Sequence, residues 1–501
     1  MNRREFLVGS GVVLGASAVR PTVAGAQAQP PRGHIIAGLS ERMLTLDPAN
    51  HYSISATSVL RHVYDPLLDV TNDDKFVPAL AESWRPVNNT TWRFTLRKGV
   101  TFHDGTPFNA DSVVFTLKRV RDGKLVKSFV YQDIEDVQKD GDYAVTVTTK
   151  RPFGSLPAHL TMLGMLPPIA AGSEDAFFQK PVGTGPFRFV SWTHGDHIEL
   201  AANPKYWKPG IPKVEKVTVR FITELSTRAA ALRAGEIHVI DRVSPDMVQT
   251  LKGTPGVKVL DTPAVEAQRW HFQLARDNVK DPRVRKAISL AIDRNVIIKD
   301  LLLGYARPVV NPVPPGLIGH TNLGQKPYDP EKAKLLLKQA GQTNLAIDFV
   351  LMKDLYPKQL EIAQAVAAML GEVGIKVNIR NLEIATAREQ RTAGNYDLFF
   401  SGWAHMPHDP DWYFGQWFTK AGAEKMTRFN DPKVEQLIAE GRVPDPKVRQ
   451  QKYEEIERIL WEDEPELWPY YSVAIYAISD KLRNFEARRD YYVLLSEVGI
   501  A

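Results

Sequence analysis

The chain has 501 residues, of which 24% are charged and 44% hydrophobic, a balance that is ordinary for globular proteins. Of the formal net charge of +5, three arginines and one glutamate in the first 26 residues supply +2, which excludes a strongly basic nucleic-acid-binding protein. The absence of cysteine excludes disulfides, thiolate nucleophiles and cysteine-based metal sites. The length allows more than one domain with its own core.

Residues 1–26 predict an export signal. The run from Asn2 to Val8, with the pair Arg3-Arg4, is typical of a twin-arginine signal, and a weakly apolar stretch follows it. Ala24-Gly25-Ala26 then offers small residues to a signal peptidase. General secretion through the same segment is the alternative route. No cysteine follows and no second apolar run of about 18 residues occurs, so we expect a mature protein from about Gln27, free in a periplasm and without a lipid anchor.

Between residues 76 and 150 the pattern predicts strands around one helix. Residues 91–96 and 142–149 alternate apolar and polar side chains, as half-buried strands do, and a helix is expected over residues 110–119. The segment 182–186, Val-Gly-Thr-Gly-Pro, is predicted to be a structural turn. It does not have the Lys-Ser/Thr that a phosphate-binding loop requires, and Pro186 prevents a regular helix start.

From residue 268 onward the pattern becomes strand, helix, strand. Residues 346–351 form a short apolar run, residues 360–373 show helical spacing that ends at Gly374, and residues 375–379 alternate. That order favours a parallel sheet and therefore an α/β fold. Asp-Pro pairs at positions 281, 329 and 431 predict helix starts, with Asp as the N-cap and Pro in the first helical position.

No catalytic constellation is apparent in the mature chain. There is no Gly-x-Ser-x-Gly, no phosphate loop and no His-Glu-x-x-His. His405, His408, Asp409 and Asp411 could form a metal site, but their spacing matches no known metal motif, and loop histidines with capping aspartates explain them more simply. We therefore predict no catalytic residue, no metal and no cofactor.

The segment from Tyr396 to Trp403 is the most informative for binding. An apolar strand ends at Gly402 and Trp403 and continues into a loop that contains Pro407 and Pro410. Ligands of α/β domains bind outside the carboxyl ends of the strands, and tryptophan offers a large apolar face with a polar edge. We expect Trp403 to line a pocket; the alternative is that it is a core aromatic.

The chain resembles the family 5 extracellular solute-binding proteins, the dipeptide, oligopeptide and nickel group of importer components. Six segments occur in the family's order and together extend over nearly the whole mature chain. They are 77–84 (VPALAESW), 92–108 (WRFTLRKGVTFHDGTPF), 183–187 (GTGPF), 203–207 (NPKYW), 281–287 (DPRVRKA) and 328–333 (YDPEKA).

The resemblance implies a periplasmic binding protein-like α/β fold (class II, cluster C), in which two lobes close on a ligand and an extra subdomain is attached. Lobe I would comprise residues 33–68, 180–267 and 477–501, the extra subdomain 69–179 and lobe II 268–476. Strands that cross between the lobes would act as the hinge. The protein, expected to be a monomer, would deliver a small-molecule solute to the permease subunits of an ABC importer, which a separate ATPase drives.

The resemblance also suggests site residues. In peptide-binding relatives an aspartate three residues after the tryptophan of the Gly-Trp motif pairs with the free amino group of the peptide, and here that position is Met406. Asp409 could replace that aspartate or could cap a helix, and Tyr356 is expected to line the pocket. Either Lys353 or Arg269 could meet a ligand carboxylate, although both are more often surface residues. The expected ligand-binding set is Trp403, Met406, His405, Asp409, Tyr356, Lys353 and Arg269.

Three alternatives stay open at this point. The cargo could be peptide-like, or it could be another small organic solute such as a sugar conjugate or an opine-like compound. A periplasmic hydrolase would need a nucleophile with its base, or a metal triad, and none is apparent. A chaperone or signalling partner could use the same cleft.

Overall fold

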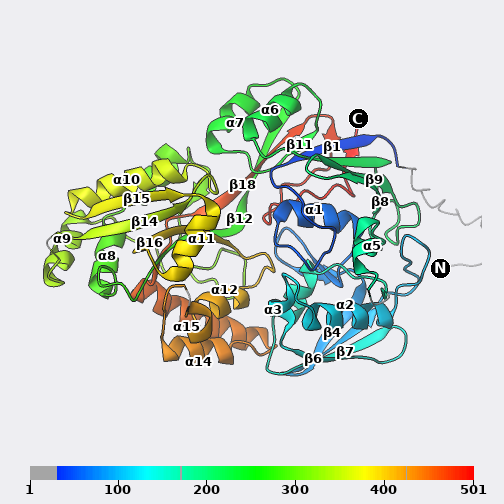
Figure 1. Ribbon diagram of the computed structural model, residues 1–501, viewed down its shortest axis with the longest axis horizontal. Helices are drawn as coiled ribbons and strands as arrows, with labels where there is room; N and C mark the ends of the chain where they lie inside the picture. Colours follow the sequence, from blue (N-terminus) through cyan, green and yellow to red (C-terminus); the bar gives the residue numbers. More distant parts are fainter. Residues whose placement is uncertain (1–30, 170–171, 343, 425) are drawn as a thin grey trace, which may run out of the picture.

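The computed structural model describes residues 31–169, 172–342, 344–424 and 426–501, so the predicted export signal lies outside the described residues. Two bodies lie side by side with two long strands, β12 (Val257–Phe272) and β18 (Tyr471–Ser479), running between them (Figure 1). Each body combines helices with part of one large sheet. The predicted α/β class and the two-lobed arrangement are therefore confirmed.

One sheet of 12 strands extends through both bodies in the order β15-β14-β16-β12-β18-β11-β1-β10-β9-β8, with β13 and β17 paired at its side. β12 and β18 are antiparallel and pair over most of their length, with a register shift between Pro263 and Ala267. The chain thus passes between the two bodies along both β12 and β18, at the centre of one sheet. Two lobes connected in this way can move about a shared hinge.

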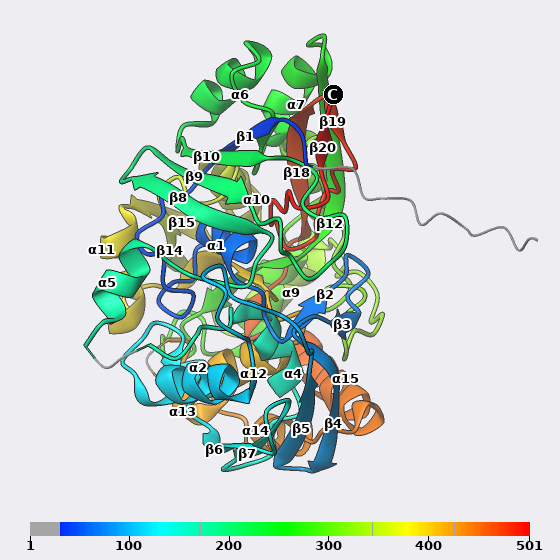
Figure 2. The same cartoon turned by 90° about the vertical axis from the view of Figure 1, so that its right-hand side faces the viewer.

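The first body contains the N-terminal strand, the C-terminal segment and the strands that lie between them in the sheet (Figure 2). Its elements are β1 (His34–Leu39), α1 (Ile54–Val63), β8 (Phe187–Thr193), β9 (His197–Ala202), β10 (Lys216–Phe221), α6 (Leu225–Arg233), β11 (Val239–Ile240), α7 (Pro245–Lys252), β19 (Leu482–Arg483) and β20 (Gly499–Ile500).

A separate sheet of four strands, in the order β4-β5-β7-β6, lies below this body in Figure 2. The elements of this part are β2 (Leu68–Val70), β3 (Phe76–Pro78), β4 (Ala81–Asn88), β5 (Thr91–Leu96), α2 (Ala110–Asp122), α3 (Ser128–Tyr131), β6 (Ile134–Lys139), β7 (Ala144–Thr149), α4 (Leu156–His159), η1 (Leu160–Met162) and α5 (Glu174–Gln179).

The second body holds the parallel strands β14, β15 and β16 with helices around them (Figure 1). Its elements are α8 (Pro282–Leu290), η2 (Val296–Leu301), β13 (Ala306–Arg307), α9 (Pro330–Gln339), β14 (Ala346–Met352), α10 (Gln359–Glu372), β15 (Lys376–Leu382), α11 (Ile384–Ala393), β16 (Leu398–Ala404), α12 (Asp411–Trp417), α13 (Lys420–Ala423), α14 (Pro432–Glu440), α15 (Pro446–Asp463) and β17 (Glu466–Leu467).

The local predictions agree closely with these elements. The expected strand at residues 91–96 is β5, and the strand, helix and strand expected from residue 346 are β14, α10 and β15, with β14 parallel to β15. The carboxylates of Asp281, Asp329 and Asp431 each accept a hydrogen bond from a backbone N–H in the first turn of the following helix. These features depend on neighbouring residues alone, which is why the sequence reveals them.

The predicted turn at residues 182–186 packs directly against the end of α1. A Cβ atom built on Gly183 would lie 1.9 Å from the carbonyl oxygen of Val63, and one on Gly185 would lie 2.5 Å from that of His62. Thr184, between the two glycines, donates a hydrogen bond of 3.0 Å to Asp65. The glycines are thus required by close backbone approach, which supports the structural interpretation of this motif.

Clusters of buried side chains follow the predicted division of the chain only approximately. One cluster draws on residues 49–165, around the four-stranded sheet, and two others lie almost wholly within residues 265–471. The expected boundaries at 267/268 and 476/477 fall inside β12 and β18, because both strands belong to both bodies. The division into lobes and subdomain stays a prediction.

Candidate functional site

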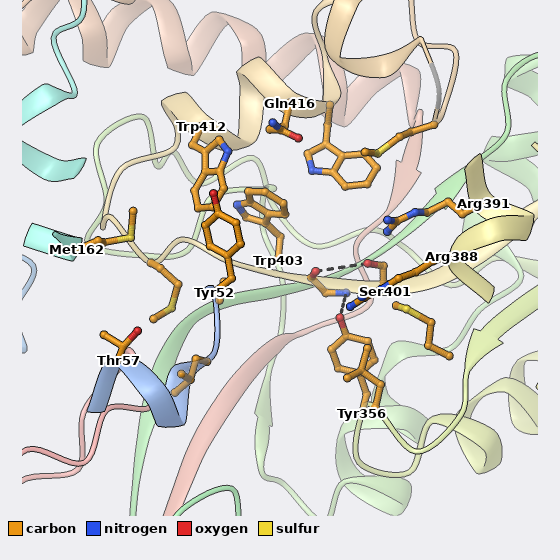
Figure 3. A pocket seen from close by; sticks show the side chains of 18 of the residues that line it. Tyr52, Thr57, Met162, Tyr356, Arg388, Arg391, Ser401, Trp403, Trp412 and Gln416 are labelled. Carbon is orange, nitrogen blue, oxygen red and sulfur yellow. Dashed lines mark hydrogen bonds between the residues drawn. The ribbon is translucent and has the colours of Figure 1, made fainter. Parts of the chain in front are cut away.

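A cavity of about 490 Å³ lies between the two bodies, next to the end of β16 (Figure 3). Residues from both bodies line it. The lining comprises Tyr52, Ile54, Thr57, Lys127, Met162, Met352, Leu355, Tyr356, Arg388, Arg391, Ser401, Gly402, Trp403, Ala404, Met406, Trp412, Gln416, Trp417, Met426 and Tyr492.

The end of β16 forms one wall of the cavity. The backbone N–H of Gly402 donates to the hydroxyl oxygen of Tyr356 at 2.9 Å, which leaves the Tyr356 O–H free to donate elsewhere. A Cβ atom on Gly402 would lie 2.7 Å from both Glu266 and Gln268, side chains of the neighbouring strand β12. A larger residue at this position would therefore displace the ends of these two side chains.

Aromatic side chains from both bodies meet over the cavity (Figure 3). Trp403 lies edge to face with Trp412, which belongs to the first turn of α12, and the two ring centroids are 5.2 Å apart. Trp412 in turn contacts Tyr52 at 5.6 Å and Phe129 at 5.8 Å, both in the opposite body. Flat apolar faces with polar edges are well suited to enclosing a small organic molecule.

Three cations line the cavity. Arg388 and Arg391 come from α11, one helical turn apart, and both side chains extend toward the cavity (Figure 3). Lys127 comes from the other body, where its amino group donates to the carbonyl oxygens of Pro48 at 2.7 Å and Met162 at 2.9 Å. Burial lowers the pKa of Lys127 to about 7.

Three of the seven residues expected from the sequence line this cavity: Trp403, Met406 and Tyr356. Trp403 is half-buried, as a pocket residue would be, although it also packs against Tyr413 at 5.9 Å. That these three bind ligand stays a prediction. The other four expected residues do not line the cavity, and each has a partner or an environment of its own that accounts for its position.

Arg269 points into the interior of the second body. Its guanidinium forms a two-pronged ion pair with Glu466 and lies 3.7 Å above the ring of Trp417. Tyr413 donates a further hydrogen bond of 2.9 Å to Glu466. Contrary to the expectation that Arg269 could meet a ligand carboxylate, the protein supplies that carboxylate itself.

The remaining three also have structural surroundings. His405 is fully buried against Tyr413, and burial lowers its pKa to about 3, so it is neutral. Asp409 accepts from the N–H of Asp411 at 2.9 Å and from Arg449 at 2.7 Å, so it is bound within the protein, although the N-cap of α12 is Pro410. Lys353 is on the surface, 2.9 Å from Glu383.

Sequence reasoning missed Arg388, Arg391, Tyr52, Lys127 and Trp412 as cavity residues. The two arginines lie in a helix whose sequence, IATAREQRTA, has the composition of an ordinary exposed helix. Tyr52 and Lys127 belong to the opposite body, and no local pattern reports which distant segments will face each other. The only available signal was Trp412, nine residues after Trp403 in a stretch rich in aromatic residues.

The four residues considered as a metal site do not form one. Within the described ranges, no group of three or more histidine or carboxylate side chains is placed to hold a metal ion. His408 instead contacts Asp74 and Asp490, while Asp411 accepts from Ser155 at 2.8 Å and pairs with Arg442 at 2.9 Å.

His408 connects the loop after β16 to two distant segments. Its Nδ1 lies 2.7 Å from Asp74 and its Nε2 lies 3.7 Å from Asp490, and both aspartates also pair with arginines, Arg489 and Arg488 respectively. Burial alone would lower the pKa of His408, but the nearby carboxylates of Asp490 and Asp74, of which Asp74 is hydrogen-bonded to the ring, outweigh burial and raise it. The ring therefore helps to hold the cavity loop against the first body.

We expect this contact to make stability depend on pH. A histidine whose pKa is raised on folding stabilises the fold fully below its unfolded pKa of 6.5, and the stabilisation is lost as the pH rises through the folded value. Wild-type protein should therefore exceed His408→Gln in free energy of unfolding by a margin that is largest below pH 6.5 and shrinks as the pH rises above it. Urea unfolding at several pH values measures this margin. The exposed His194→Gln is the control, and a margin that grows with pH would refute the prediction.

A large sheet shared by two bodies, with an aromatic cavity enclosed between them, defines a two-lobed solute-binding protein. The model of the bacterial extracellular solute-binding proteins, family 5, matches residues 75–425. The chain therefore belongs to this family, whose members bind solutes for ABC importers, and the resemblance noted in the sequence is confirmed.

Known proteins are similar to this chain over almost its full length. The glutathione-binding protein GsiB of Pectobacterium atrosepticum is 28% identical over 506 residues, covering 97% of this chain and 96% of that protein. The binding protein AgaA of A. tumefaciens R10, solved with agropinic acid, is 26% identical with a TM-score of 0.80, covering 94% and 99%. DppA of Helicobacter pylori, solved with the peptide STSA, is 27% identical with a TM-score of 0.79, covering 93% and 98%.

Proposed function

We propose that this protein captures a small organic solute in the cavity between its lobes and delivers it, as a monomer, to the permease of an ABC importer. The observation that supports this most strongly is the cavity itself, because aromatic residues of both bodies enclose it at the carboxyl end of β16. Its volume of about 490 Å³ suits a molecule of peptide-like size. Glutathione, for which relatives are named, and the agropinic acid and the peptide STSA of the solved structures are all small organic molecules of this kind.

The residues that line the cavity support binding of a ligand without catalysis. General acid–base or nucleophilic catalysis requires a base beside the reacting group. No histidine, aspartate, glutamate or cysteine occurs among the residues that line the cavity in the described part of the chain. Lys127, whose lowered pKa would suit a base, has its amino group engaged with the carbonyl oxygens of Pro48 and Met162. The proposal is therefore of a receptor and not of a hydrolase.

Native mass spectrometry of freshly purified mature protein tests the proposal. Binding proteins with tight sites retain their cargo, so we expect a single small molecule at one copy per protein, released by unfolding in urea. The refolded protein should then take up the released molecule again. Purified protein that carries no adduct and takes up nothing from a periplasmic extract would contradict the proposal.

We further propose that the protein works in the periplasm and is exported by the twin-arginine route. The segment with Arg3 and Arg4 lies outside the described residues, so the proposal depends on its sequence. Within the described ranges, no helix has both the length and the apolar character needed to cross a membrane.

Replacing Arg3 and Arg4 together with lysine should leave folded precursor in the cytoplasm, because the twin-arginine receptor reads the paired guanidinium groups. Immunoblots of periplasmic and cytoplasmic fractions measure the distribution. Lysine keeps the positive charge that general secretion uses, so unchanged periplasmic yield would indicate that route instead.

A further inference from the structure

The charge of the cavity is one-sided. Its lining contains Arg388, Arg391 and Lys127, of which the two arginines are charged at neutral pH, but no acidic residue in the described part of the chain. The position at which peptide-binding relatives are expected to carry an aspartate is Met406, which also lines the cavity. A positively charged end of a ligand would find no counter-charge here, and burying such a charge without a partner is costly.

The two arginines of α11 have no counter-charge of their own. Among the described residues, neither the exposed Arg388 nor the half-buried Arg391 forms an ion pair or donates a side-chain hydrogen bond, whereas the buried Arg269 and Arg449 do. Burial, and to a smaller extent the charge of Arg388, lowers the pKa of Arg391. Two neighbouring cations at the edge of an apolar cavity are therefore a place where an anion would relieve both desolvation and repulsion.

The unsatisfied polar atoms of the lining are of one kind. Nε of Arg391, Nε1 of Trp412 and Nε1 of Trp417 are buried and have no hydrogen-bond partner among the described residues. All three are donors. Unpaired buried donors also occur away from the cavity, at Trp192 and Trp270, so these three agree with an anionic ligand but do not require one. The hydroxyl of Tyr356, which is free to donate, adds to this set.

A carboxylate beside the cavity, Glu266, is already engaged. Glu266 lies beside Gly402 but does not line the cavity; it accepts hydrogen bonds from Tyr491 at 2.7 Å and from Gln268 at 3.1 Å. It is thus held toward the first body and is not the partner of Arg388 or Arg391.

We propose that the cargo is an organic anion, with a carboxylate bound by Arg388 and Arg391 and a flat apolar part held against Trp403 and Trp412. This inference rests on the proposed function and specifies the class of solute. Guanidinium groups bind carboxylates through paired hydrogen bonds, which a helix with arginines one turn apart can present to a single ligand end. The end of the cargo that lies near Met406 is neutral, such as an acylated amine.

Calorimetry with three matched probes tests the proposal. N-acetyl-leucylphenylalanine carries a carboxylate and a blocked amine, its C-terminal amide is neutral, and leucylphenylalanine amide carries only a positive charge. Protein freed of cargo by unfolding and refolding should bind the acid and bind the two amides much more weakly. Replacing both arginines, Arg388→Gln with Arg391→Gln, should weaken binding of the acid at least about 30-fold, as loss of a buried charged partner does.

Matched variants separate this effect from general ones. Lys338→Gln with Lys376→Gln removes the same amount of charge from exposed positions of the same body, and should leave binding of the acid unchanged. The single variant Arg388→Gln changes an exposed residue and should fold even if the double variant does not. It should also weaken binding of the acid. Circular dichroism verifies the fold of each.

The outcomes distinguish this inference from the proposed function. Equal binding of the acid and its neutral amide, or no effect of the arginine variants, would overturn the anionic class while leaving a solute receptor intact. The same holds if native mass spectrometry finds a neutral or cationic cargo. Failure of every probe, together with the absence of any retained cargo, would count against the receptor itself.

Discussion

Replacing Arg269 with methionine is expected to lower the free energy of unfolding by about 3–5 kcal/mol, the cost of leaving one member of a buried ion pair alone. Glu466 would then be a fully buried carboxylate whose only remaining side-chain donor among the described residues is Tyr413. Burial lowers the pKa of Arg269 only to about 10, so the guanidinium is charged at neutral pH and its loss removes a full charge.

A paired substitution shows whether the isolated charge is the cause. In Arg269→Met with Glu466→Gln no charge is left without a partner, so this double variant should be more stable than Arg269→Met alone. Urea unfolding of both proteins, with the exposed Arg283→Met as control, measures the difference. A loss below about 1 kcal/mol for Arg269→Met would show that water reaches the pair.

Trp403→Ala is expected to weaken cargo binding by about 2–4 kcal/mol, because it removes a large aromatic anchor from the centre of the cavity. The melting temperature of the cargo-free protein should change little, since Trp403 is only half-buried. Calorimetry with the recovered cargo and thermal unfolding without it separate the two effects.

The control for this variant is Trp84→Ala, a half-buried tryptophan of β4 outside the cavity lining, which should leave affinity unchanged. A large fall in the melting temperature of cargo-free Trp403→Ala would show that Trp403 belongs to the core, through its contacts with Tyr413 and Trp417.

Local features of the fold could be predicted from the sequence because their causes are local. The alternation of β5, the helical spacing of α10 that ends near Gly374 with φ 87°, and the Asp-Pro starts of three helices all depend on residues a few positions apart. The two-lobed arrangement itself came from family resemblance, since the pairing of β12 with β18 joins segments about 200 residues apart that no periodicity links.

The candidate site was predictable only in part, for the same reason. Trp403 and Met406 follow a recognisable strand end, and the cavity is found there. Whether a charged residue faces a ligand or an internal partner depends on tertiary contacts. Arg269 was expected near a ligand but pairs with Glu466, whereas Arg388, which no motif marks, lines the cavity.

Small-angle X-ray scattering tests the central claim most directly, namely that a solute is captured between two lobes. The radius of gyration is measured for cargo-free protein and for the same protein saturated with the cargo recovered from it. A ligand that contacts both lobes favours the state in which they are together, so the account predicts a smaller radius with cargo. An identical radius in the two states at saturation would contradict it.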